Sequence, residues 1–259
     1  MKFKISFFIV PVLFAILSFG CTSATNGSNG DINLTISAAS SLKDALDEVI
    51  DSYKAIHDDV NIIANYGSSG SLMSQINEGA KVDLFISAAQ SQMDALHDRG
   101  LLLEETRSNI LQNSLVFIIA KGKPTITLDD IKTEDLETIA IGETNSVPAG
   151  QYAKEAFEKL GLYEDMEDKL LFAKDVRTVL RWVESNNVQG GIVYSSDASI
   201  SDKVEISFTI PPESHAPITY PAAVIKDSSS EDVAKVFLDY LRGEEASEIF
   251  EYFGFQTAK

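Results

Sequence analysis

The stretch that decides the fold runs from Ile32 to Ala88 and has the sequence INLTISAASSLKDALDEVIDSYKAIHDDVNIIANYGSSGSLMSQINEGAKVDLFISA. Apolar strand-like runs at its start, middle and end alternate with segments whose apolar residues have helical spacing. We expect three strands and two intervening helices, at 32–37 (strand), 42–53 (helix), 60–66 (strand), 72–79 (helix) and 82–88 (strand). This alternation predicts a parallel sheet covered by helices.

Two serine-rich turns join these strands to the helices that follow, SAASSL at 37–42 and YGSSGSL at 66–72. Each turn places hydroxyls and free backbone N–H groups at a helix N-terminus, where the helix dipole is positive. Neither turn contains Lys or Arg. We interpret them as parts of a site that binds a small oxyanion through neutral donors, among them Ser41 and Ser69. A plain N-cap at Ser41 and a flexible turn at Ser69 are the structural alternatives.

A second α/β unit follows the breaker KGKP at 121–124. We therefore predict an α/β fold of two lobes, each a mainly parallel sheet flanked by helices. The first lobe comprises 31–113 together with 222–259, and the second comprises 114–221. Two crossing strands near Asn113 and Ala222 would join the lobes and act as the hinge.

The second unit supplies three more candidate donors beyond the carboxyl ends of strands, where ligands of open α/β sheets bind. Ala149 and Val176 stand at the starts of predicted helices and would donate their backbone N–H groups. Tyr194 ends a predicted strand and would donate its hydroxyl. An ordinary helix start after Pro148, a core valine and a half-buried core tyrosine are the alternatives.

The first twenty residues predict a signal peptide, with Lys2 and Lys4 before an apolar run that is short for a transmembrane helix. Gly20 precedes the single cysteine, Cys21, which we expect to become the lipidated N-terminus of a lipoprotein. A soluble exported protein cut nearby and an uncleaved anchor are the alternatives. Residues 21–30 are small and polar and predict a flexible tether to the membrane.

The net charge of −18 argues against nucleic acid as a partner, because phosphates need basic surfaces. It also gives an anionic ligand no general electrostatic attraction. Acidic residues are abundant, but no His–Cys cluster or calcium-loop spacing accompanies them, so we expect no bare metal cation and no cofactor.

An anchored α/β hydrolase is the alternative from another class, with Ser69 as its nucleophile. The segment Gly67 to Ser71 reads GSSGS, which is not G-x-S-x-G. None of His57, His97 and His215 has an obvious role as the base. We expect a binding protein rather than an enzyme.

Several strings, in this order, resemble the periplasmic molybdate-binding proteins of ABC transporters. They are ASSL at 39–42, GSSGSL at 67–72 with Gln75-Ile76, VDLFISA at 82–88, NSLV at 113–116, VPAG at 147–150, DVR at 175–177 and GIVYSSDA at 191–198. The resemblance covers nearly the whole chain after the tether.

The resemblance implies a type II solute-binding protein that closes its two lobes on molybdate, and also on tungstate, and delivers it to an ABC permease. It implies that Ser41, Ser69, Ala149, Val176 and Tyr194 hold the oxyanion and that no cationic side chain touches it. We expect a monomer at the extracytoplasmic face, in contact with the membrane only through its lipid anchor. The choice between Ser40 and Ser41, and any help from Ser68, stay open.

The chemistry of the ion agrees with a site made of donors. Molybdate and tungstate are fully deprotonated near neutral pH, whereas phosphate keeps a proton that needs an acceptor. Sulfate is also a bare dianion, so only size can exclude it. A receptor for sulfate or another oxyanion is therefore the alternative within the same class.

Overall fold

The structure is a computed structural model that describes residues 32–132 and 136–258. The predicted signal peptide, the tether and Cys21 lie outside these residues. Within them the strands form two sheets. The first has the order β11-β4-β10-β3-β1-β2, with β1 (Ile32–Ala39), β2 (Val60–Gly67), β3 (Leu84–Ile86), β4 (Ser108–Gln112), β10 (Thr219–Val224) and β11 (Gln256–Thr257). The second has the order β7-β6-β8-β5-β9, with β5 (Leu115–Ala120), β6 (Ile139–Gly142), β7 (Leu170–Ala173), β8 (Gly190–Tyr194) and β9 (Val204–Thr209).

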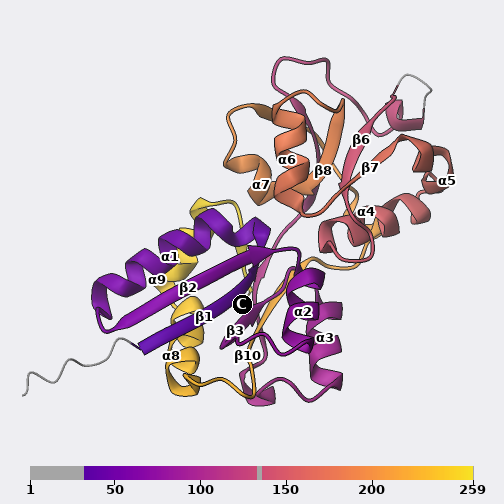
Figure 1. Cartoon of the computed structure of the whole chain (residues 1–259). Coiled ribbons are helices and arrows are strands. Elements are labelled where there is room, and N and C mark those ends of the chain that lie inside the picture. Colours follow the sequence, from indigo (N-terminus) through magenta and orange to yellow (C-terminus); the bar gives the residue numbers. More distant parts are fainter. Residues whose placement is uncertain (1–31, 133–135, 259) are drawn as a thin grey trace, which may run out of the picture. The chain divides into compact units, whose positions relative to one another are not determined.

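Helices cover both faces of the first sheet. Successive side chains of a strand point to opposite faces, so a strand that is apolar throughout has apolar side chains to bury on each face. Leu84 and Ile86 of β3 belong to one hydrophobic cluster, and Phe85 between them belongs to another. Figure 1 shows the helices divided in the same way. One group is α1 (Lys43–Ile56), α8 (Glu231–Leu241) and α9 (Glu244–Tyr252), and the other is α2 (Ser69–Asn77) and α3 (Gln90–Asp98).

The predicted first helix illustrates how the sequence pattern becomes structure. In α1 the buried residues are Ala45, Leu46, Val49, Ile50 and Tyr53, which form one face at helical spacing. That face packs into the core beside β1, whose Leu34 and Ile36 are fully buried. The helix ends at Ile56, three residues beyond the predicted end.

The second sheet is surrounded by its own helices, mainly α4 and α6 (Figure 1). Its central strands are apolar along their whole length, as expected for strands buried on both faces. Close helix packing needs glycine here, because a Cβ on Gly191 would lie 2.7 Å from Val179 of α6. The remaining elements are α4 (Pro148–Lys159), α5 (Tyr163–Met166), α6 (Val176–Glu184), α7 (Ser195–Ser199), η1 (Ser40–Leu42), η2 (Glu104–Thr106), η3 (Asp130–Lys132), η4 (Glu167–Lys169) and η5 (Pro212–Ser214).

The α/β class is confirmed, but both sheets are mixed rather than mainly parallel. The pairs β1–β2, β1–β3, β6–β7 and β6–β8 are parallel, whereas β10 and β5 pair antiparallel with both of their neighbours. The difference arises where the chain crosses between the sheets, because β5 and β10 each enter a sheet from the other one rather than through a βαβ crossover. The sequence analysis also missed the short elements β4, β11, α5 and α7.

The chain passes from the first sheet to the second between Gln112 and Leu115, and it returns between Thr209 and Thr219. Both sheets belong to one compact unit, residues 31–259. The lobe boundaries and the hinge remain predictions, although β10 of the first sheet already begins at Thr219, before the predicted boundary. No described helix is long and apolar enough to cross a bilayer.

Candidate functional site

The five predicted donors line one small cavity between residues of the two sheets. This cavity, which we call the site cavity, has a volume of about 10 Å³. A space of this size is about that of one water molecule, so it excludes an organic substrate. Its lining consists of Ala39, Ser40, Ser41, Gly67, Ser68, Ser69, Ala88, Val147, Pro148, Ala149, Val176 and Tyr194. The structure therefore brings together all of Ser41, Ser69, Ala149, Val176 and Tyr194.

Ser41 lies in η1, directly after β1, and is buried. Its hydroxyl lies 3.0 Å from the hydroxyl of Tyr220 in β10. The side-chain amide of Asn113 donates to the Tyr220 oxygen at 3.3 Å. With that oxygen accepting, the Tyr220 proton can point to Ser41, which leaves the Ser41 proton free to face the cavity.

Ser69 is the first residue of α2 and is fully buried. Its hydroxyl oxygen accepts from the backbone N–H of Ala88 at 3.0 Å, so its proton is also free for the cavity. Ser68 differs, because its hydroxyl caps α2 by accepting from the Ser71 N–H at 3.3 Å and donates to the Ser71 hydroxyl at 2.8 Å. This geometry favours Ser69 over Ser68 as a donor to a ligand. Ser40 also lines the cavity, and Ser41 remains the predicted donor of this pair.

Ala149 and Val176 bring helix N-termini to the same cavity. Ala149 is in the first turn of α4, which begins at Pro148, and Val176 is the first residue of α6. Backbone N–H groups in a first turn have no acceptor within their helix, and they carry the positive end of its dipole. With Ser69 at the start of α2, the first turns of three helices meet at the cavity.

Tyr194 ends β8, and its hydroxyl is buried without a hydrogen-bond partner in the described structure. Burial, the main cause, raises the pKa of this phenol well above its usual range, so the hydroxyl stays protonated and can donate. A buried polar group without a partner costs free energy. The hydroxyl therefore favours binding of an acceptor.

No Lys, Arg, His, Asp or Glu belongs to the lining among the residues described. Charges lie behind it instead, where Arg177 Nε is 2.9 Å from Oδ1 of the fully buried Asp197, in an ion pair too bent to be a hydrogen bond. Burial raises the pKa of Asp197 to about 6, although Arg177 and the Tyr194 N–H both lower it. The described lining thus has no charged side chain, and its polar side chains are serine and tyrosine hydroxyls.

The two lobes also touch directly beside the cavity. The Gly70 N–H donates to the Ser146 carbonyl at 2.9 Å, which joins α2 to the loop before α4. A Cβ at position 70 would lie 2.5 Å from that carbonyl oxygen, closer than atoms can pack. Gly70 therefore permits the close approach of the lobes, and its N–H serves closure rather than the ligand.

The histidines do not assemble a hydrolase site around Ser69. His57 stacks on Tyr53, His97 pairs with Glu104 at 2.6 Å, and His215 lies against Tyr152. None of these histidines lines the site cavity. Within the described ranges, no group of three or more His, Cys, Asp or Glu side chains could hold a metal cation.

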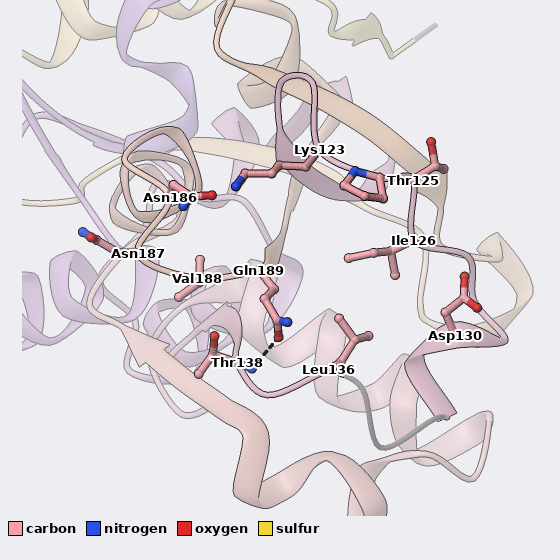
Figure 2. Close-up of a pocket in the computed structure, with 11 residues that line it drawn as sticks. Lys123, Thr125, Ile126, Asp130, Leu136, Thr138, Asn186, Asn187, Val188 and Gln189 are labelled. Atoms are coloured by element: carbon pink, nitrogen blue, oxygen red, sulfur yellow. Dashed lines mark hydrogen bonds between the residues drawn. The ribbon is translucent and has the colours of Figure 1, made fainter.

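A larger and more open pocket of about 660 Å³ lies at the amino ends of β6 and β8, away from all five predicted donors (Figure 2). Thr138 and Gln189, which precede these strands, line it together with Lys123. The Thr138 N–H donates to Gln189 Oε1 at 3.1 Å. Because ligands of such sheets bind at the carboxyl ends of strands, this pocket is not the candidate site.

Sequence reasoning missed the residues that orient the donors. The sequence motifs contain Asn113, Arg177 and Asp197 only as letters of matching strings, and they do not contain Tyr220. Their roles depend on contacts between residues far apart in the chain, such as Ser41 with Tyr220. A buried polar residue in an otherwise apolar strand, as Tyr220 is in β10, was the one available signal.

Comparison with known proteins now adds to this geometry. Residues 34–256 match the family described as bacterial extracellular solute-binding proteins. The chain belongs to this family. The solute-binding protein is 39% identical over 254 residues to YvgL of Bacillus subtilis (strain 168), covering 97% of this chain and 98% of that one. The name of YvgL assigns it provisionally to the ABC transporter substrate-binding lipoproteins.

Molybdate-binding proteins are among the relatives, which confirms the resemblance found in the sequence motifs. The solute-binding protein is 38% identical over 250 residues to the molybdate-binding protein ModA of Escherichia coli (strain K12), covering 94% of this chain and 96% of ModA. A solved substrate-binding domain, ascribed to a molybdenum ABC transporter of Clostridium difficile, has a TM-score of 0.70 and 43% identity. It covers 88% of this chain and 100% of that domain. The family is not enzymatic, so the hydrolase alternative is wrong.

Replacing Gly70 by Ala tests the contact between the lobes. The new methyl group would overlap the Ser146 carbonyl in the arrangement described, and separation of the lobes would relieve this overlap. We expect ligand binding to weaken by roughly 1–3 kcal/mol, the usual cost of overpacking, with no change in the melting temperature without ligand. Calorimetry and thermal unfolding measure the two quantities. Ser74→Ala, at an exposed position of the same helix, is the matched control; equal affinity in both variants would contradict the closure role of Gly70.

Replacing Asp197 by Asn tests the buried carboxylate. Because the folded-state pKa of about 6 lies above the ordinary value of 3.8, the folded protein binds the proton more tightly than the unfolded chain. The ionised form therefore destabilises the fold, and this penalty grows as the pH rises from 4 to 7. We expect the free energy of unfolding of the wild type, minus that of Asp197→Asn, to fall over this range in denaturant titrations. A difference that does not vary with pH would refute the raised pKa.

Proposed function

We propose that this solute-binding protein captures molybdate, and also tungstate, and delivers it to an ABC permease. The observation that carries the proposal is the described lining of the site cavity, which offers hydroxyls and helix N-termini and has no charged side chain. Two serine hydroxyls, the first turns of α2, α4 and α6, and the unpartnered Tyr194 hydroxyl face one small space. The names of its relatives, ModA and the molybdenum transporter domain, support the same ion.

Donors alone suit a bare dianion. A tetrahedral oxyanion offers only acceptors, so every N–H and O–H around it can be used and no cation is needed. Phosphate would bring its own proton into a lining where no described carboxylate can accept it. The expected roles are backbone N–H donation from Ala149 and Val176, and hydroxyl donation from Ser41, Ser69 and Tyr194.

The donors come from both lobes, which provides the mechanism of capture. Ser41 and Ser69 follow strands of the first sheet, whereas Ala149, Val176 and Tyr194 belong to the second. An ion that bonds to both sets stabilises the closed arrangement over the open one. Binding is therefore a population shift toward closure.

The proposed location is the extracytoplasmic face of the membrane. The apolar N-terminal run and the Gly20-Cys21 pair support a signal peptide and lipidation of Cys21. The relative YvgL is itself named as a lipoprotein. The anchored protein would act as a monomer that meets its permease partners at the membrane.

Calorimetry of the purified protein with molybdate, tungstate, sulfate and phosphate tests this function. We expect molybdate and tungstate to bind with micromolar or tighter affinity and phosphate to give no heat, because its proton would face only donors. Binding of sulfate in preference to molybdate would make the protein a sulfate receptor. Absence of molybdate binding would overturn the proposal.

Replacing Ser41 or Ser69 by Ala tests the site itself. Each change removes one hydroxyl donor to a charged ligand, and we expect molybdate binding to weaken by about 1–3 kcal/mol. Ser74→Ala, exposed in α2, removes a hydroxyl from the same helix as Ser69 without touching the cavity and should leave affinity unchanged. Full affinity in both site variants would place the ligand elsewhere.

A further inference from the structure

We propose that Arg177 is a positioning residue that fastens the two lobes together behind the ligand. This inference rests on the proposed function, in which the site cavity holds the oxyanion. Arg177 does not line the cavity. Arg177 follows Val176, a proposed donor of the second lobe. Its side chain contacts the backbone of Ser41, a proposed donor of the first lobe.

The guanidinium has partners in both lobes. Nη2 donates to the backbone carbonyl oxygen of Ser41 at 3.1 Å and lies 2.5 Å from Oδ2 of Asp44 at the start of α1. Nε lies 2.9 Å from Oδ1 of Asp197 in α7, which belongs to the same lobe as Arg177. One side chain thus joins two residues that flank the cavity, Val176 and Ser41, from opposite sheets.

The two carboxylate contacts of Arg177 differ in their burial and in the lobes that they join. The Asp197 side chain is fully buried and packs within the second lobe, so it can hold the guanidinium in place whether the lobes are open or closed. The Asp44 side chain is 45% exposed, and it meets Arg177 only across the gap between lobes. The bonds to Asp44 and Ser41 therefore stabilise the closed form alone and shift the population toward it.

Arginine suits this task better than lysine. Its planar group presents several N–H donors in fixed directions and can bond a carboxylate and a carbonyl at once, whereas a lysine ammonium is a single point charge. Two carboxylates already surround this cation, so it has no unpaired charge to draw into the cavity. The bond to the Ser41 carbonyl also fixes the backbone from which the Ser41 hydroxyl faces the ligand.

Asp44→Asn tests the proposal, because positioning and simple electrostatics predict opposite signs. Removing a negative charge near an anion site would tighten the binding of molybdate if only the field mattered. Loss of the contact between lobes should instead raise the Kd, by about 2- to 5-fold for a partly exposed ion pair, through faster dissociation. Stopped-flow kinetics gives the dissociation rate, and Arg177→Lys, which keeps the charge, should raise it as well.

Asp51→Asn is the matched control, since Asp51 is an exposed carboxylate of the same helix. We expect Asp51→Asn to bind molybdate with the same Kd as the wild type. Without ligand, Asp44→Asn and Asp51→Asn should both have the melting temperature of the wild type. Unchanged or tighter molybdate binding in Asp44→Asn would overturn the role of Arg177.

A measurement without any anion separates this inference from the proposed function. Spin labels on the triple variant Cys21→Ser, Ser74→Cys and Glu155→Cys report the distance between lobes, because positions 74 and 155 are exposed in α2 and α4 and the native cysteine is removed. Adding Asp44→Asn should lower the population at the short distance. An unchanged population would overturn the inference even if molybdate binds, whereas a lowered one would support it even if the ligand proves to be another anion.

Discussion

The first turns of α2, α4 and α6 meet at one small cavity, and the rest of the structure depends on this meeting of unpaired N–H groups. Parallel strands place the helices that follow them at the same edge of a sheet, so each lobe presents N-termini in one direction. Two such edges facing each other need an acceptor between them. The constraint explains why no described charged residue lines the cavity and why the approach at Gly70 is so close.

Around these donors, a layer of polar residues forms hydrogen bonds with the serine hydroxyls that line the cavity. Asn113 donates to Tyr220, and Tyr220 lies within hydrogen-bond distance of Ser41. Ser69 accepts from Ala88 and thereby keeps its own proton for the cavity. The geometry of such a site depends on the residues that orient the donors as well as on the donors themselves.

The sequence allowed the α/β class and the five cavity residues to be predicted, because strand-to-helix turns depend on local patterns. Ser41 and Ser69 occupy such turns, and Val176 follows a capping aspartate. The direction of β5 and β10 could not be predicted, because it follows from where the chain crosses between sheets. The partners of Arg177 were equally hidden, since Asp44 is one of many acidic residues and only the closed fold brings it near.

The neutral lining has a consequence for ionic strength. A dianion approaching a protein of net charge −18 meets repulsion that dissolved salt screens. Once enclosed at the proposed site, it would be held by uncharged groups, whose hydrogen bonds dissolved salt screens little. Salt should therefore speed the entry of the ligand while leaving its escape unchanged, the reverse of the behaviour of receptors that bind anions with lysine and arginine.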